Sequence, residues 1–139
     1  MKPRAVLDSN VLIGDRNDIL LLLAATRAYT LVTSAYIISE VVRIRTEIAY
    51  ERGEDLLANR SRLNRLVWRL CECSVMANYT RISGGTYSWL EDQDDEPVIA
   101  TALVGKAEYL VTEDKDLIPP PDLNPYPSAA HPLFAGVYF

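Results

Sequence analysis

Several residue types that catalysis often uses are scarce in this chain. Its 139 residues include a single histidine, His131, and two cysteines, Cys71 and Cys73. Because His131 lies in a proline-rich stretch, a histidine-dependent triad or a histidine general base is not expected. Cys71 and Cys73 form a C-x-C pair without a further cysteine to complete a zinc site, so we expect two half-buried thiols near the end of a helix. The sequence also lacks G-x-x-x-x-G-K-[ST] and G-x-G-x-x-G, so a nucleotide-cradling loop is not supported.

Long hydrophobic runs are missing as well. Apolar residues make up 49% of the chain, yet no run approaches the roughly 18 residues that would span a bilayer. Residues 1–5 lead into a short strand-like run without the apolar segment and cleavage site of a signal peptide. We therefore expect a soluble, cytoplasmic protein with no membrane partner. The length predicts a single domain over residues 1–139.

Positive charge is the minority: 14 lysines and arginines against 19 aspartates and glutamates, with a formal net charge of -5. That balance argues against a general nucleic-acid coat protein, which would bind phosphates with clustered basic residues. The arginines nevertheless gather in the middle third of the chain: Arg43, Arg45, Arg52, Arg60, Arg62, Arg65, Arg69 and Arg81. Acidic segments beside a basic middle fit a metal-dependent enzyme acting on a polyanion. Two solvated helices with ordinary arginines fit the same pattern.

The apolar pattern alternates between strands and helices. Short apolar or β-branched runs predict strands over residues 4–8, 30–33, 74–76 and 109–112. Helical periodicity and capping residues, including Ser34 as an N-cap and Gly53 and Gly105 as stops, predict helices over residues 15–28, 35–52, 54–70 and 95–105. The nearly unbroken apolar run Ile19–Ala25 predicts that its helix is covered on most sides. This alternation predicts an α/β fold, a parallel sheet with helices on both faces.

Carboxylates stand where such a sheet would gather them. Asp8 ends the first strand, and Asp114 and Asp116 follow the strand over residues 109–112. Ligands of open α/β sheets bind at the carboxyl ends of the strands, so acids there would meet in one crevice. Close like charges repel, and such a cluster needs a cation or a raised pKa. Mg²⁺ and Mn²⁺ are the ions that suit oxygen-rich sites.

Two further stretches add acid to the predicted crevice. Glu40 falls in the helix over residues 35–52, where pairing with Arg43 on the same face is the alternative to a site role. Asp94 and Asp95 precede the next helix, where a helix cap or the helix dipole explains one of them. Each stretch has an ordinary explanation alone. However, acidic residues occur in four separate stretches, at positions that the predicted fold could bring together.

Four segments in order resemble the PIN-domain nucleases, which include the toxin ribonucleases of prokaryotic toxin–antitoxin pairs. They are AVLDSNVLI, TSAYIISEVVR, DDEPVIATAL and AEYLVTEDKDL, and the resemblance runs from about residue 4 to residue 118. It implies a three-layer α/β/α sandwich with a central parallel sheet and an acidic pocket at the strand ends. It also implies Mg²⁺- or Mn²⁺-dependent hydrolysis of phosphodiester bonds, usually in RNA, here expected to be single-stranded.

The resemblance also implies the residues of the site. The catalytic acids that it assigns are Asp8, Glu40, Asp95 and Asp114, and the metal ligands are Asp8, Asp95, Asp114 and Asp116. Asn10 and Thr112 fall where small polar residues orient the acids, and Asp94 is the alternative to Asp95. Glu113 stands where a glycine or arginine is common. Arg43 and Arg45 are candidates for contacts with phosphate, although surface pairing with Glu40 or Glu47 would also explain them.

The C-terminal part departs from the family pattern. Six of the eight prolines lie between Pro119 and Pro132, so residues 119–132 are expected to be irregular. This segment stands where the family has a final strand and short helix, which puts a fifth strand in question. Residues 136–139 could still return as an edge strand. The family also implies two kinds of protein partner, an antitoxin and a second copy in a homodimer.

Two other functions stay open on the sequence. One is a catalytically inactive domain of the same fold that binds RNA or a protein. The other is a phosphatase of the haloacid dehalogenase type with Asp8 as the nucleophile. Such enzymes carry a D-x-D pattern, whereas the third position here is Asn10.

Overall fold

A five-stranded parallel sheet forms the centre of the computed structural model, which describes residues 2–14, 17–77, 95–114, 117 and 135–138. The strands follow the order β3-β2-β1-β4-β5, and every neighbouring pair is parallel. Their bounds are β1 Arg4–Leu7, β2 Thr30–Thr33, β3 Ser74–Met76, β4 Tyr109–Thr112 and β5 Ala135–Tyr138. The fifth strand that the sequence left in question is therefore present, as an edge strand beside β4.

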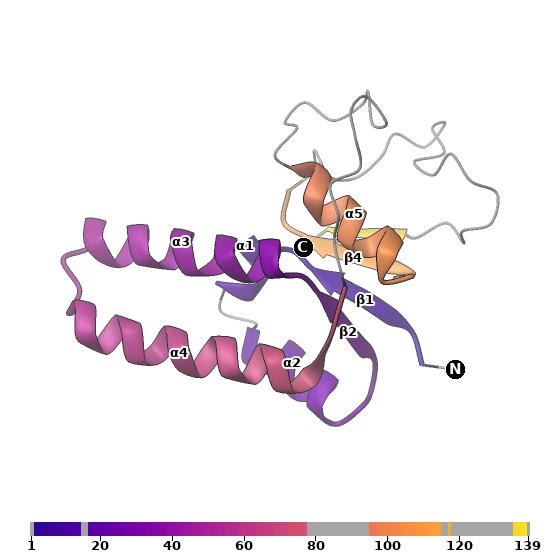
Figure 1. Ribbon diagram of the computed structural model, residues 1–139, viewed down its shortest axis with the longest axis horizontal. Helices are drawn as coiled ribbons and strands as arrows, with labels where there is room; N and C mark the ends of the chain where they lie inside the picture. The colour runs from indigo at the N-terminus through magenta and orange to yellow at the C-terminus, as the bar shows by residue number, and fades with distance from the viewer. Residues whose placement is uncertain (1, 15–16, 78–94, 115–116, 118–134, 139) are drawn as a thin grey trace.

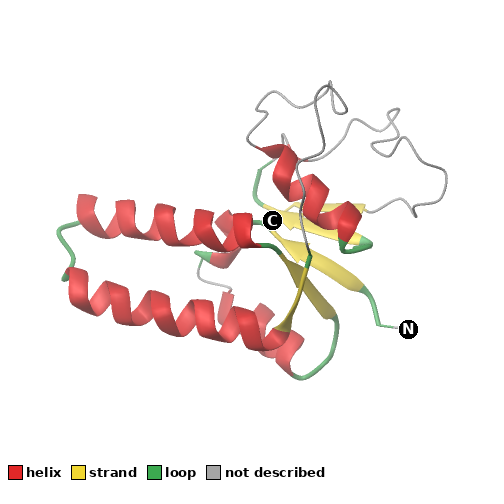
Figure 2. Ribbon diagram, viewed as in Figure 1, coloured by secondary structure: helices red, strands yellow, loops and turns green. Residues whose placement is uncertain are grey.

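Helices cover both faces of the sheet. In the described part of the chain they are α1 Ser9–Leu12, α2 Asn17–Ala25, α3 Ala35–Glu51, α4 Leu56–Cys73 and α5 Glu96–Val104. Figure 1 shows α3 and α4 as a long antiparallel pair that extends beyond the strands. In Figure 2, α5 lies on one side of the strands and α2 on the other. This arrangement is the predicted three-layer α/β/α sandwich. No helix of the described residues has the length and apolar character needed to cross a membrane.

The strand order reverses between β1 and β4. The chain moves from β1 outward to β2 and β3, and then returns through α5 to place β4 on the other side of β1. Right-handed crossovers put the helices of these two directions on opposite faces. Leu7 pairs with Val111, so the residues that follow them leave the sheet side by side. This reversal point is where open α/β sheets bind ligands.

The central strands and the start of α3 match the sequence predictions. Val6, Leu31 and Leu110 are completely buried, as expected for strands covered on both faces, which form continuous apolar runs. Ser34 caps α3, because its side chain accepts a hydrogen bond from the Ile37 backbone N–H at 3.4 Å. These short strands and the helix cap could be predicted because each depends on local sequence alone.

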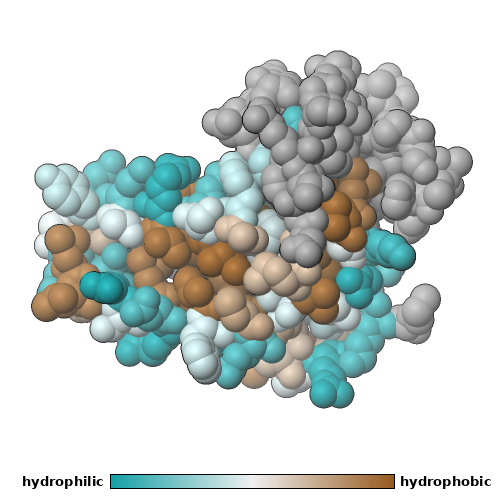
Figure 3. Space-filling model, in the orientation of Figure 1, coloured by the Kyte–Doolittle hydropathy of each residue, from teal (hydrophilic) through white to brown (hydrophobic). Residues whose placement is uncertain are grey.

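The prediction that α2 is covered on most sides is wrong. Ile19 and Leu22 are 63% and 59% exposed, and on this helix only Leu21 and Ala24 are buried. An unbroken apolar run lacks the periodicity that would show which face is covered, and α2 packs with one face only. Figure 3 shows a further hydrophobic band along the α3–α4 pair.

Several predicted helix ends also differ from the structure. The short helix α1 was not predicted, because a single turn is too short to show a period. The helix α4 begins at Leu56 rather than Glu54, since the Asp55 side chain accepts from the Leu57 backbone N–H at 3.0 Å and caps it. It continues to Cys73, where the sequence predicted an end at Leu70.

Gly105 is a position where the fold tolerates no side chain without adjustment. A Cβ there would lie 2.2 Å from Val32 Cγ1 and 3.0 Å from the Thr101 carbonyl oxygen, and Val32 is completely buried. We therefore expect Gly105→Ala to lower the free energy of unfolding by about 1–3 kcal/mol through overpacking. Urea denaturation would measure this loss. In a Val32→Ala background the penalty should shrink because the clashing methyl is gone, and an equal penalty in both backgrounds would contradict the steric explanation.

Candidate active site

Asp8 is held firmly at the carboxyl ends of β1 and β4. Its backbone N–H donates to the Val111 carbonyl at 2.9 Å, and the residue is only 5% exposed. One carboxylate oxygen, Oδ1, accepts from the Ser9 backbone N–H at 2.8 Å. The other, Oδ2, accepts from the Thr112 hydroxyl at 2.8 Å. Hydrogen bonds to both oxygens fix the orientation of the carboxylate.

Thr112 connects Asp8 with the loop that carries Asp114. The Thr112 hydroxyl donates to Asp8 and also accepts from the Asp114 backbone N–H at 2.9 Å. Thr112 is completely buried, so these two partners define its hydroxyl orientation. One side chain thus sets the direction of the first acid and the path of the chain toward the second.

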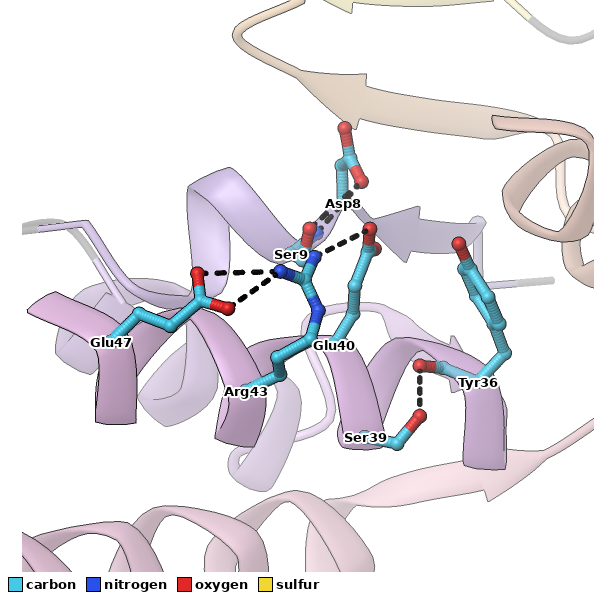
Figure 4. Close-up of polar contacts among 7 residues, drawn as sticks. All are labelled: Asp8, Ser9, Tyr36, Ser39, Glu40, Arg43 and Glu47. Carbon is cyan, nitrogen blue, oxygen red and sulfur yellow. Dashed lines mark hydrogen bonds and ion pairs between the residues drawn. The ribbon is translucent and has the colours of Figure 1, made fainter. Parts of the chain in front are cut away.

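Acids from two other segments act on Asp8. Burial is the main cause that raises the pKa of Asp8, and the hydrogen bonds from Thr112 and Ser9 oppose it. The negative charges of Glu40 and Asp114 raise the Asp8 pKa further. In Figure 4 the Glu40 side chain extends from α3 toward Asp8. The structure therefore brings Asp8, Glu40 and Asp114 into one acidic environment.

Arg43 lies beside this environment and is paired with two glutamates. Its Nη2 is 3.8 Å from Glu40 Oε1, and its Nη1 is 3.2 Å from Glu47 Oε1 (Figure 4). This is the helical pairing that the sequence offered as the alternative to a phosphate contact. Arg45 makes no ion pair within the described residues and lines a separate cleft on the α4 side of α3.

Asn10 supports the loop after β4 rather than the Asp8 carboxylate. Its side-chain Oδ1 accepts from the Glu113 backbone N–H at 3.2 Å. The exposed Glu113 side chain lies near the end of α1, because a Cβ on Gly14 would be 3.8 Å from Glu113 Oε1. Because the Asn10 side chain is an amide without a carboxyl group, it cannot act as the second acid of a D-x-D phosphatase.

Asp95 lies at the same edge of the sheet as Asp8. It precedes α5, whose N-terminus is at the carboxyl edge because α5 leads into β4. The Asp95 side chain makes no capping hydrogen bond, so the cap that the sequence suggested is absent there. The charges that raise the Asp8 pKa are those of Glu40 and Asp114, and Asp95 is not among them. Asp94 and Asp116 lie outside the described residues.

Two residues of this region were missed by the sequence analysis. Glu96, in the first turn of α5, is 8% exposed, and its Oε1 has no hydrogen-bond partner in the described structure. Buried carboxylate oxygens are normally paired, so this atom is an available acceptor. Tyr36 precedes Glu40 by one helical turn, and Figure 4 shows its hydroxyl extending in the same direction as the Glu40 carboxylate. The four-residue spacing of Tyr36 and Glu40 was the signal that could have found it.

The chemistry of these side chains fits a hard divalent cation, although they are not closed around one. Carboxylate oxygens are the preferred ligands of Mg²⁺ and Mn²⁺, and a cation would relieve the repulsion that raises the Asp8 pKa. Among the residues that the structure describes, no group of three or more acidic, histidine or cysteine side chains is arranged to hold an ion. Glu40 extends toward Asp8 (Figure 4), but its Oε1 also lies 3.8 Å from Arg43 Nη2, so Arg43 would compete with a cation for this carboxylate.

The fold and this site define a class: α/β proteins with an open parallel sheet and acidic side chains at the point where its strand order reverses. A family model described as PIN domain matches residues 4–116. The chain therefore belongs to the PIN-domain family. The assignment indicates a nuclease, and PIN domains are generally dependent on divalent metal ions. No curated protein and no solved structure gave a significant match.

Proposed function

We propose that the protein is a metal-dependent endoribonuclease that hydrolyses phosphodiester bonds in single-stranded RNA, as the toxin-like members of the PIN family do. The observation that carries this proposal is the buried Asp8, whose ionised form is opposed by burial and by the charges of Glu40 and Asp114. A cluster of this kind is costly without a counter-ion. A bound cation would neutralise the negative charge of this cluster, and the same cation would bind a phosphate group of the RNA substrate.

The positions of Asp8, Glu40 and Asp114 support the proposed roles of these three acids, and Asp95 and Asp116 take theirs from the resemblance to the PIN-domain nucleases. Asp8 and Asp114 would hold Mg²⁺ or Mn²⁺, with Asp95 and Asp116 as further ligands. When bound, such an ion lowers the pKa of a water molecule and neutralises charge on the scissile phosphate. Glu40 lies next to Asp8 with 21% of its side chain exposed, so its carboxylate can accept a proton from a water that attacks the phosphate.

The same proposal includes two protein partners: an antitoxin, and a second copy of the chain in a homodimer. The exposed apolar side chains of α2, Ile19, Leu22 and Leu23, support it, because they offer a contiguous surface at helical spacing. The size of the complex in solution, alone and with a co-expressed antitoxin, would test this part separately from the nuclease activity.

A catalytically inactive binding module is the second candidate. The observation that favours it is that the described acids do not close around a single ion. Calorimetric titration with Mn²⁺ separates the two functions. A nuclease should bind the ion with a dependence on Asp8, whereas a degenerate pocket should show no saturable binding.

Thr112 provides a test of how the acids are oriented. Thr112→Val removes a buried hydroxyl that donates to Asp8 Oδ2 and accepts from the Asp114 backbone N–H. We expect a loss of about 1–3 kcal/mol in the free energy of unfolding. We also expect metal affinity or RNA cleavage to fall by roughly 10–100-fold, as for other residues that orient metal ligands. Thermal melts and cleavage rates would measure the two effects.

The matched control is Thr112→Ser, which keeps the hydroxyl and removes only a methyl group. It should retain most of the cleavage rate and of the metal affinity. If the serine and valine variants lose activity equally, the loss does not depend on the hydroxyl group, and the orienting role is wrong.

A further inference from the structure

An arginine-lined cleft of about 650 Å³ lies between α2, α3 and α4, separate from the acids. Five arginines contribute to its walls, and Asp18 is the single acid among the described lining residues. The arginines come from α3, from the residue after α3 and from α4: Arg45, Arg52, Arg62, Arg65 and Arg69. This concentration is unusual in a chain whose net charge is -5.

Most of this positive charge is not neutralised within the described residues. Arg69 donates to Asp18 Oδ1 at 2.8 Å, and Arg62 Nη2 lies 3.5 Å from Glu54 Oε2. Arg45, Arg52 and Arg65 form no ion pair in the part of the chain that the structure describes. Like charges that line one hollow repel each other, so binding of an anion there is favoured.

The cleft begins close to Asp8. Ile13 and Gly14, at the end of α1, line the cleft, and α1 starts directly after Asp8. Glu113, directly after β4, reaches the same end of α1, since a Cβ on Gly14 would be 3.8 Å from its Oε1. One helix of four residues therefore separates the acids from the cleft. A polymer with one phosphate at Asp8 can extend from there into the arginines.

We propose that this cleft binds the phosphodiester backbone of single-stranded RNA on one side of the bond that is cut. The inference rests on the proposed nuclease function and adds the surface that holds the substrate. Arginine presents a planar fork of donors that matches phosphate oxygens. The described lining contains no aromatic side chain on which bases could stack. The cleft therefore contributes affinity that depends on the length of the RNA and on salt, and not on base sequence.

The test is RNA binding by catalytically inactive protein, so that cleavage does not interfere. In an Asp8→Asn background, a fluorescein-labelled 12-nucleotide RNA of mixed sequence is titrated by anisotropy at several salt concentrations. Arg65→Ala should weaken binding by roughly tenfold at low salt and lower the slope of log K against log[salt] by about 0.7, the value for one phosphate contact of a single strand. Arg45→Ala, from α3, is a second, independent variant with the same expected result.

Arg60→Ala is the matched control, because Arg60 is an exposed arginine of the same helix that does not line the cleft. It removes the same charge and should leave both affinity and salt slope close to the parent protein. If Arg65→Ala and Arg45→Ala, folded by circular dichroism, bind RNA as Arg60→Ala does, the cleft is not the RNA site. Tighter binding of a polyglutamate peptide than of the RNA would overturn the assignment in favour of an acidic protein segment.

These outcomes are separate from the fate of the nuclease proposal. Wild-type protein that cuts RNA, with arginine variants that bind like the control, would leave the nuclease intact and reject the cleft. Wild-type protein that does not cut, with weaker RNA binding in Arg65→Ala and Arg45→Ala, would support the cleft and reject the nuclease.

Discussion

Asp8→Asn is expected to abolish RNA cleavage. The substitution keeps the shape of the side chain but removes the anion at the centre of the acidic environment, where Asp8 faces Glu40 and Asp114. Cation binding and charge stabilisation at the phosphate contribute several kcal/mol to such reactions, so the rate should fall by on the order of 10³-fold or more. The cleavage rate of a defined 12-nucleotide RNA in Mn²⁺ measures this loss.

Asp55→Asn is the matched control for this change. Asp55 makes the N-cap of α4 on the exposed surface, accepting from the Leu57 backbone N–H, and asparagine caps a helix about as well as aspartate. This variant should therefore cut RNA at the wild-type rate. Metal-free Asp8→Asn should melt at or above the wild-type temperature, since burial and neighbouring charges oppose the ionised form of Asp8. A folded Asp8→Asn protein that cuts at the wild-type rate would contradict the proposed role of Asp8.

Stabilisation by a divalent cation is the second large effect. Asp8 follows β1, Glu40 lies in α3 and Asp114 follows β4. These segments are apart in the unfolded chain, so an ion that the three acids share binds only the folded protein. At a free concentration one hundred times its Kd, Mn²⁺ should add about 2.7 kcal/mol to the free energy of unfolding and raise the Tm by roughly 5–10 °C. The same ion should leave the Tm of Asp8→Asn nearly unchanged, and Asp55→Asn should respond as the wild type does.

The pH dependence of this effect has a definite sign. The folded protein holds the proton of Asp8 more tightly than the unfolded chain, whose carboxyl has the ordinary pKa of 3.8. Without metal, this group therefore lowers stability as the pH rises from 3.8 through the raised pKa of folded Asp8. Mn²⁺ competes with that proton, so the increase in Tm should grow over the same range. An increase of equal size at pH 4 and pH 7, or one that persists in Asp8→Asn, would contradict binding at Asp8.

The sequence predicted those parts of the fold that depend on local patterns. The strands β1 and β4 are continuous apolar runs ending in Asp8 and in the Asp114 turn, and Ser34 is a clear N-cap. The exposure of α2 was not predictable, because its unbroken apolar run carries no information about which face packs. The strand β5 follows a proline-rich segment, where pairing depends on the edge that β4 offers rather than on local propensity.

The candidate site was likewise predictable from the sequence only in part. The carboxyl ends of parallel strands meet at one edge, which was enough to predict that Asp8 and Asp114 lie near each other. Sequence position could not give side-chain direction, so the hydrogen bond of Asn10 to the loop after β4 was not foreseen. Helical spacing identified Arg43 as a partner of Glu47. It could not show that Arg45 lines a cleft, since that cleft exists only once α4 packs beside α3.

The most direct test of the nuclease function is incubation of wild-type protein with a mixed pool of single-stranded RNA, with Mn²⁺ and with a chelator. We expect discrete fragments with Mn²⁺ that disappear with the chelator and in Asp8→Asn. Intact RNA in every condition, from folded protein that shows no calorimetric binding of Mn²⁺, would contradict the nuclease and favour the inactive binding module.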